Sequence, residues 1–171
     1  RSSARGLPMH GIMSFDADDM ATMQAKGTLQ DVITHEMGHV LGFSSYFFQS
    51  FGLSSGTSYT GSAAVAAYRS LTGDSSLRSV PLEDGGGRGT ALSHWEESIF
   101  RNELMTGYAE NSPPMPISTL SVGALEDLGY TVSYAGAEPY SLPGSIRSSI
   151  RLSSLQTSML DGASLESAMA S

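Results

Sequence analysis

The chain has 171 residues, no cysteine and a formal net charge of −8. Its length and its 40% content of hydrophobic residues predict one soluble globular domain, and no apolar run is long enough to cross a membrane. Lys and Arg are few and scattered, which argues against nucleic acid as a partner. The lack of cysteine excludes disulfides and thiolate metal sites, so a bound metal would need histidine and carboxylate ligands.

The N-terminal region predicts a strand and then a short helix. Residues 1–5 contain neither Met nor an apolar signal segment, as expected for a processed form or a piece of a longer protein. Residues 10–16 alternate loosely between apolar and polar side chains, which predicts a strand. The acidic residues that follow, Asp16, Asp18 and Asp19, do not have the spacing of an EF-hand calcium loop. We therefore favour capping of a helix over residues 18–24.

A longer helix is predicted over residues 28–42. Thr28 and Asp31 fit a capping box at its start. Gly42 is a natural end, because glycine accepts the left-handed conformation at a helix C-terminus. Apolar residues recur at helical spacing and predict a face that packs on a core: Leu29, Val32, Ile33, Met37, Val40 and Leu41.

This helix carries the motif His35-Glu36-Met37-Gly38-His39. Residues four apart share a helix face, so His35 and His39 can bind one metal ion together. Glu36 lies close enough to take a proton from a water on that metal, which is the general-base role in a metallopeptidase. The same pattern also arises by chance, as two surface histidines and a solvated glutamate. We favour the zinc site because the neighbouring residues predict the helix that the motif needs.

A catalytic zinc ion usually takes three protein ligands and keeps a fourth position for water. Only one of the four histidines, His94, lies downstream of the helix, and we predict it as the third ligand. A carboxylate from a second helix is the competing choice. Four glutamates remain open for that role: Glu96, Glu97, Glu103 and Glu126.

The region between the helix and His94 predicts packing and loops. Residues 43–61 are rich in Ser, Gly and aromatic side chains, and we interpret Phe47, Phe48 and Phe51 as packing under a surface loop. Residues 62–71 predict a helix of small side chains. The glycine-rich run 85–89 lacks the residues and the strand-to-helix context of a phosphate-binding loop, so we interpret it as a flexible loop.

Downstream of His94, Met105 is either core packing or a turn beneath the metal site. Its spacing to Tyr108 favours packing of that tyrosine over a role at a reacting oxygen. Prolines predict a loop over residues 111–116.

A helix over residues 117–129 is predicted next, capped by Ser118 or Ser121 and ended by Gly129, and then a short strand over residues 130–134. Residues 144–171 are Ser-rich with thinly spaced apolar side chains. For this tail we favour a poorly ordered segment over an amphipathic helix.

These blocks resemble the leishmanolysin family of metzincin zinc peptidases, especially its bacterial-type members. The likeness covers residues 11–140, and the blocks that carry it stand in the family's order: 35–43, 93–96, 102–106 and 118–130. The family has a large insertion between the glycine and the third histidine of its motif, and Gly42 and His94 are separated in this way. The resemblance implies the zinc ligands His35, His39 and His94, the general base Glu36 and the Met-turn residue Met105.

The resemblance also implies an α+β, metzincin-like catalytic domain over residues 1–143, followed by the tail 144–171. Its expected parts are a small mixed sheet with residues 12–15 at its edge, an active-site helix, a Met-turn and a C-terminal helix. The N-terminal subdomain is expected to be shorter than in the family. The chain also lacks the cysteines of the protozoan members, and its tail matches nothing in the family. An extracellular or cell-surface location is implied, although this chain carries no signal segment.

The implied activity is that of a zinc-dependent endopeptidase that holds one Zn²⁺ ion. A polypeptide substrate would lie along the edge strand, and Glu36 would pass the proton of a zinc-bound water to the leaving amine. Residues 114–117 are candidates for the specificity pocket. Two alternatives remain open at this point: a zinc hydrolase of a non-protein substrate, and a non-catalytic interaction or adhesion module on the same scaffold.

Overall fold

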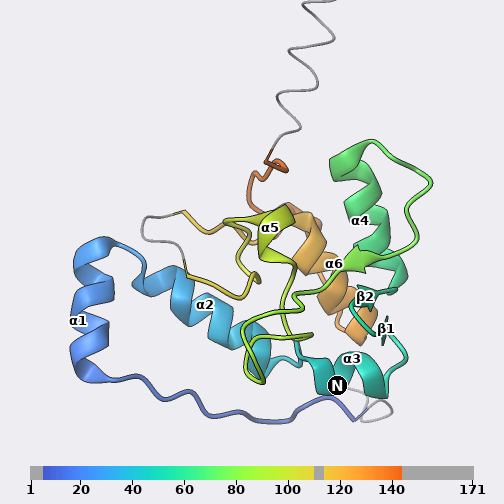
Figure 1. Cartoon of the computed structure of the whole chain (residues 1–171). Helices are drawn as coiled ribbons and strands as arrows, with labels where there is room; N and C mark the ends of the chain where they lie inside the picture. The colour runs from blue at the N-terminus through green and yellow to red at the C-terminus, as the bar shows by residue number, and fades with distance from the viewer. Residues whose placement is uncertain (1–5, 110–113, 144–171) are drawn as a thin grey trace, which may run out of the picture. The chain divides into compact units, whose positions relative to one another are not determined.

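The computed structural model describes residues 6–109 and 114–143. The chain divides into a unit over residues 1–140 and a second over residues 141–171, and the description below concerns the first. That unit is an α+β structure (Figure 1). Its helices are α1 (Ala17–Lys26), α2 (Leu29–Val40), α3 (Ser45–Ser50), α4 (Ser62–Thr72), α5 (Glu97–Phe100), α6 (Thr119–Leu128) and the 3-10 turn η2 (Tyr134–Gly136). Its strands are β1 (Ser54–Ser55), β2 (Ser58–Tyr59) and β3 (Val80–Pro81).

The sheet is small and antiparallel, with the strand order β1-β2-β3. Tyr59 pairs with Ser54 on one side and with Val80 on the other. The prediction of a mixed sheet is therefore wrong. The strand expected over residues 130–134 is also absent, and part of it forms η2 instead.

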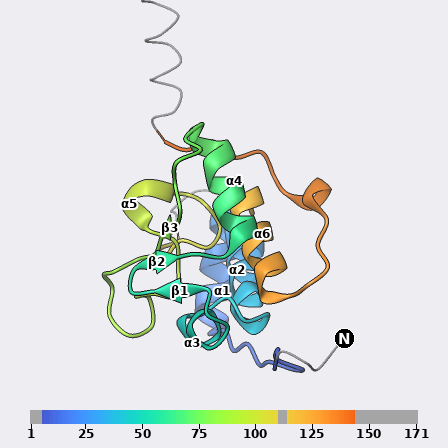
Figure 2. The same cartoon turned by 90° about the vertical axis from the view of Figure 1, so that its right-hand side faces the viewer.

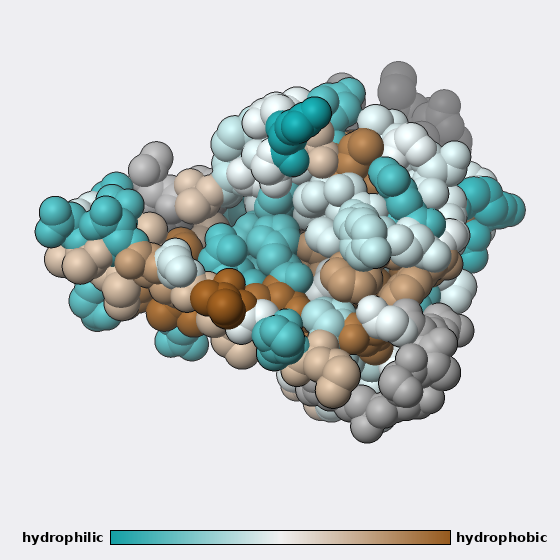
Figure 3. All heavy atoms as spheres, turned by 90° about the horizontal axis from the view of Figure 1, so that it is seen from below, coloured by the Kyte–Doolittle hydropathy of each residue, from teal (hydrophilic) through white to brown (hydrophobic). Residues whose placement is uncertain are grey.

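The strand predicted over residues 10–16 is wrong as well. Residues 6–16 form neither helix nor strand. The segment runs beside α2, where Gly11 lies against Val40. Two of its apolar side chains are largely exposed, Met9 at 92% and Ile12 at 87%. Figure 3 shows hydrophobic side chains on the face that this segment crosses. A strand needs a hydrogen-bonding neighbour, which an alternating pattern does not supply.

Helix α1 begins as the sequence predicts. The carboxylate of Asp16 accepts a hydrogen bond of 2.9 Å from the backbone N–H of Asp18, so Asp16 is the N-cap. Asp18 and Asp19 lie in the first turn, where negative charge favours a helix. Capping, which we favoured over calcium binding, is confirmed for Asp16.

Helix α2 departs from its prediction in two respects. Thr28 is its N-cap but makes no side-chain capping bond, so the capping box is wrong. Asp31 instead accepts a hydrogen bond of 3.0 Å from the backbone N–H of Met115. No residue of α2 is fully buried, and Met37 is 48% exposed, so the apolar stripe is only partly covered within the described residues. Periodicity shows which residues share a face but not what covers that face. The predicted end is confirmed: Gly42 has a φ of 104°.

The core is built from aromatic residues. Trp95 lies in its middle with no exposed surface, and its ring meets Phe43 and Tyr59 edge-on at centroid distances of 5.0 and 5.3 Å. Phe48 packs edge-on against both of these partners. The predicted packing role of Phe48 is confirmed, but it lies in α3 rather than under a loop.

Helices α4 and α6 lie side by side in both views (Figures 1 and 2). Both were predicted, and Ser118 and Gly129 are the N-cap and C-cap of α6. The Asp127 carboxylate of α6 accepts hydrogen bonds from the backbone N–H groups of Ala63 and Ala64 in the first turn of α4, at 2.9 and 3.0 Å. This carboxylate satisfies two of the donors that a helix N-terminus leaves open.

The glycine run 85–89 is a loop, as predicted. Within residues 6–109 and 114–143, no helix combines the length and the apolar composition that a membrane span requires. The predicted domain boundary after residue 143 stays a prediction. The tail 144–171 and part of the predicted loop 111–116 lie outside the described residues.

Candidate metal centre

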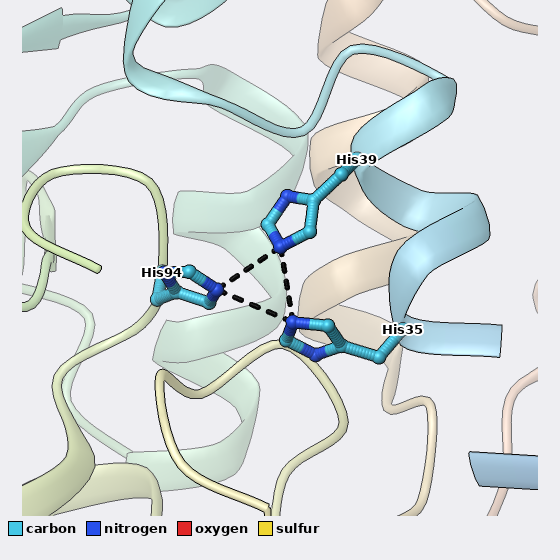
Figure 4. A group of neighbouring side chains, drawn as sticks. All are labelled: His35, His39 and His94. Carbon is cyan, nitrogen blue, oxygen red and sulfur yellow. Dashed lines mark hydrogen bonds between the residues drawn. The ribbon is translucent and has the colours of Figure 1, made fainter. Parts of the chain in front are cut away.

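Helix α2 brings His35 and His39 together. Their spacing of four residues places both rings on one face, and their Nε2 atoms are 3.0 Å apart (Figure 4). The rings meet at an interplanar angle of 81°. Both side chains are partly buried.

His94 reaches the same point from the segment between β3 and α5. Its Nε2 atom lies 3.0 Å from that of His39 and 3.2 Å from that of His35. The peptide group between His94 and Trp95 is hydrogen-bonded at both ends: the N–H of Glu83 donates to the His94 carbonyl, and the N–H of Trp95 donates to the Met105 carbonyl. The buried indole of Trp95 thus anchors the residue that follows His94 in the core.

The three Nδ1 atoms point away from one another, each toward a backbone carbonyl oxygen. The distances are 2.6 Å from His35 to Leu104, 2.6 Å from His39 to Phe43 and 2.8 Å from His94 to Thr90. A carbonyl oxygen only accepts hydrogen bonds, so each Nδ1 carries the proton. In the neutral ring, each Nε2 atom then presents a lone pair, and the three Nε2 atoms converge within 3.2 Å.

This convergence fits a cation and is unfavourable without one, since lone pairs at this separation repel. A zinc ion with Zn–N bonds of about 2.0–2.1 Å at tetrahedral angles separates its nitrogen ligands by about 3.3 Å. The observed separations of 3.0–3.2 Å lie close to that value. The hydrogen bonds at Nδ1 also match the usual arrangement in zinc sites, where the second nitrogen of a ligating histidine donates to a carbonyl or carboxylate.

Burial favours the neutral, metal-binding form of His35 and His94. Burial lowers the pKa of His35, and it lowers the pKa of His94 to about 4. The hydrogen bonds to the carbonyls of Leu104 and Thr90 oppose this effect, because they favour the charged ring. At neutral pH these two rings need not lose a proton before a metal binds.

Met105 packs beneath the helix that carries the histidines. It is buried, and a Cβ atom added at Gly38 would lie only 2.7 Å from its sulfur. Glycine at this position, between Glu36 and His39, therefore permits the close approach of the Met105 turn. Met105 is thus buried packing against α2, and its role as a turn beneath a metal ion stays a prediction.

Glu36 opens onto a cavity of about 200 Å³ beside the histidines. His35 and Glu36 form one wall, and Leu104, Tyr108 and Met115 contribute to the rest. Tyr108 is 49% exposed, so the packing role that we predicted for it is wrong. Met115, in the segment proposed from sequence as a specificity pocket, does line the cavity next to Glu36.

The four glutamates considered as alternative ligands are engaged elsewhere or do not join the histidines. Glu96 caps α5, and Glu126 accepts a hydrogen bond from the Tyr134 hydroxyl. Glu103 is fully buried, where burial raises its pKa and four hydrogen bonds oppose that rise. Among the described residues, the potential ligand that joins His35 and His39 is His94 and not a glutamate.

A second group of carboxylates lies together at Glu83, Asp84 and Glu96. Its buried member, Glu83, accepts hydrogen bonds from the backbone N–H groups of Gly85 and Glu97. These bonds shape the loop that leads to His94, which accounts for the burial of this side chain.

Sequence reasoning missed the groups that hold the histidines in place. These are three backbone carbonyls, of Phe43, Thr90 and Leu104, for which side-chain patterns contain no signal. Sequence reasoning also missed the burial of the Glu103 carboxylate and its four hydrogen bonds, because the sequence offers this residue only as one glutamate among several.

Comparison with known families finds a match to the sequence model described as Leishmanolysin, over residues 3–145. The chain is 37% identical over 120 residues to the leishmanolysin homolog of Crithidia fasciculata, covering 62% of this chain and 18% of that protein. It is 32% identical over 145 residues to the leishmanolysin of Leishmania donovani, covering 78% of this chain and 24% of that protein. A leishmanolysin-like peptidase of Drosophila melanogaster is 41% identical over 76 residues, which are 44% of this chain and 11% of the fly protein. The chain thus spans a quarter or less of the length of each of these relatives.

Proposed function

The chain belongs to the leishmanolysin family, and on this premise we propose that it is a zinc-dependent endopeptidase. The observation that carries the proposal is the convergence of three Nε2 lone pairs, each fixed by a hydrogen bond at Nδ1, beside a cavity lined by Glu36. A glutamate within reach of a three-histidine metal site is the arrangement that peptide hydrolysis by a metal requires.

In this proposal His35, His39 and His94 hold one zinc ion, and Glu36 is the general base. Zinc bound there supplies Lewis acidity, which polarises a peptide carbonyl and makes a water more acidic. Glu36 accepts the proton of the attacking water and delivers it to the departing amine nitrogen. The carbonyls of Leu104, Phe43 and Thr90 keep the three rings oriented throughout.

The cavity beside Glu36 receives one side chain of the polypeptide substrate. Its walls are largely apolar, with Val32, Leu104 and Met115 among them, so we expect a preference for an apolar residue next to the cleaved bond. By its family, we also propose that the protein acts outside the cell or at the cell surface. Detection in the culture medium or in a cell-surface fraction tests the location.

The test is cleavage of an unfolded polypeptide by the purified chain loaded with zinc, beside Glu36→Gln. Loss of a general base is expected to lower the rate by about 10²–10⁴ fold, while zinc binding stays near one ion per chain. Glu126→Gln, which changes an exposed carboxylate of α6, is the matched control and is expected to cleave normally.

The ligand set is tested by zinc content. His94→Ala is expected to weaken zinc binding strongly, whereas His10→Ala, at an exposed histidine, leaves it unchanged. Normal zinc affinity in the His94 variant would remove His94 from the ligand set. If the parent chain binds zinc but cleaves no polypeptide under any condition, the endopeptidase proposal is refuted and a non-catalytic module becomes the better reading.

A further inference from the structure

Glu103 is a carboxylate with no exposed surface, one residue before the carbonyl that holds His35. Its Oε1 atom accepts hydrogen bonds from the Ser118 N–H at 3.1 Å, the Ser118 hydroxyl at 2.6 Å and the Ser121 hydroxyl at 2.7 Å. Its Oε2 atom accepts from the Met105 N–H at 2.7 Å. Four donors from two separate segments therefore meet on one buried side chain.

In each of these four hydrogen bonds the partner of Glu103 must be the donor. The two backbone N–H groups can only donate. The Ser118 hydroxyl oxygen already accepts from the Leu120 N–H, and the Ser121 oxygen accepts from the Trp95 indole N–H, so each hydroxyl proton is left to point at Glu103. A carboxyl group that receives four donors acts as an acceptor only, which is the property of the ionised form.

This carboxylate is connected to His35 through the backbone of Leu104 and Met105. Its bond to the Met105 N–H closes a tight turn around Leu104. The Leu104 carbonyl, inside that turn, accepts the Nδ1–H of His35 at 2.6 Å. The direction of the carbonyl, and with it the orientation of the ring, follows from the turn.

The carboxylate is connected to His94 by two routes through Trp95, the next residue. The Trp95 N–H donates to the Met105 carbonyl at 2.9 Å, on the turn itself. The Trp95 indole N–H donates to the Ser121 hydroxyl at 2.9 Å, and this hydroxyl in turn donates to the Glu103 carboxylate. The backbone and the side chain of Trp95 are thus each hydrogen-bonded to a residue that itself donates to Glu103.

We propose that Glu103 is a positioning residue for the metal centre, whose buried carboxylate orients the Leu104–Met105 turn so that His35 and His94 converge on one ion. The inference rests on the proposed zinc site. It extends that proposal because Glu103 touches neither a histidine nor the cavity beside Glu36, and its effect passes through Leu104 and Trp95. Glu103 connects the Leu104–Met105 turn to the N-terminus of α6. The other two proposed ligands, His35 and His39, come from α2.

Glu103→Gln is the direct test, because it keeps the shape and removes one acceptor. With the amide oxygen on the serines, the amide NH₂ group faces the Met105 N–H, and two donors repel at the turn. We expect the affinity for zinc, measured by competition with a chromophoric chelator, to fall by about 10–100 fold, the range for groups that orient metal ligands. The visible spectrum of the Co²⁺-loaded variant is expected to change as well, because the ligand geometry changes.

Asp127→Asn is the matched control. Asp127 also accepts two backbone N–H groups, from Ala63 and Ala64, and the amide also leaves one of them facing a donor. These bonds join α4 to α6. Asp127 also accepts a hydrogen bond from the Tyr59 hydroxyl at 3.4 Å, and none of these bonds leads to the Leu104–Met105 turn or to a histidine. We expect Asp127→Asn to lower the stability of the metal-free chain to urea, with zinc affinity and cobalt spectrum unchanged.

The outcomes are distinct. A Glu103→Gln variant that loses stability but keeps parental zinc affinity and spectrum makes Glu103 a structural residue only, and the proposal is overturned. Should this variant not fold, Ser121→Ala decides: it removes the link from Trp95 to Glu103 and is expected to weaken zinc binding several-fold, and unchanged affinity there overturns the proposal. Because affinity is the readout, a parent that binds zinc without cleaving peptides refutes the peptidase and leaves this inference standing. A parent that binds no zinc overturns both.

Discussion

The contact between Gly38 and Met105 predicts that Gly38→Ala destabilises the parent chain but stabilises the Met105→Ala variant. Gly38 lies inside α2, between the two histidines of that helix. A Cβ atom there would lie 2.7 Å from the sulfur and 2.9 Å from the terminal methyl carbon of Met105. Ordinary contacts of such atoms lie at about 3.5–4.0 Å. Because Met105 is only 2% exposed, its side chain has little room to move aside.

Two opposing effects decide the stability of Gly38→Ala. Alanine favours the helix over glycine by about 1 kcal/mol. Overpacking of a filled core costs about 1–3 kcal/mol. The sum is a destabilisation of about 0–2 kcal/mol. Met105→Ala alone removes buried atoms and is expected to cost about 2–5 kcal/mol.

In the Met105→Ala background the overlap is gone, and only the helix preference remains. Gly38→Ala is then expected to stabilise the chain by about 1 kcal/mol, so the coupling between the two sites is about 1–3 kcal/mol. The assay is urea unfolding of the parent, both single variants and the double variant. A chelator is present throughout, so that metal binding does not contribute.

Gly123→Ala in both backgrounds is the control. Its Cβ atom would meet the backbone of Ala63 at 2.9 Å, between α4 and α6, which Met105→Ala does not relieve. Its effect is therefore expected to be the same in both backgrounds. If the effects of Gly38→Ala and Met105→Ala simply add, the side chain of Met105 does not press on α2, and the account of why glycine occupies position 38 is wrong.

Three further predictions follow from other contacts. Burial raises the pKa of Tyr59 and of Tyr140 above the usual value of about 10, so the folded chain keeps protons that the unfolded chain releases, and the free energy of unfolding falls as the pH rises above about 10. Urea unfolding at rising pH measures this loss, and Tyr59→Phe is expected to make it less steep. Zinc at 100 times its dissociation constant is expected to raise the free energy of unfolding by about 2.7 kcal/mol, whereas magnesium has no effect, which thermal unfolding with each ion checks. Asp31→Asn weakens the support of Met115 at the cavity wall and is expected to raise KM more than it lowers kcat, which steady-state kinetics on a short peptide would show; an unchanged KM would exclude this role.

The local sequence was sufficient for the parts of this protein that depend on short-range geometry. The spacing of His35 and His39 places them on one helix face, and the backbone of α2 needs no tertiary contact to do so. Helix starts and ends were also predicted from the sequence, as at Asp16, Gly42 and Gly129, because a capping bond or a left-handed glycine acts within a few residues. The family, too, followed from blocks of sequence in a fixed order.

The tertiary structure decided everything that depends on a partner far away in the chain. It brought His94 within 3.2 Å of the pair on α2, placed the Met105 sulfur against Gly38 and gathered four donors on Glu103. Within the part of the chain that the structure describes, it also left residues 10–16 without a strand partner and the apolar stripe of α2 only partly covered. Sequence patterns report the preferences of neighbouring residues, whereas pairing and burial depend on which distant groups are packed against them.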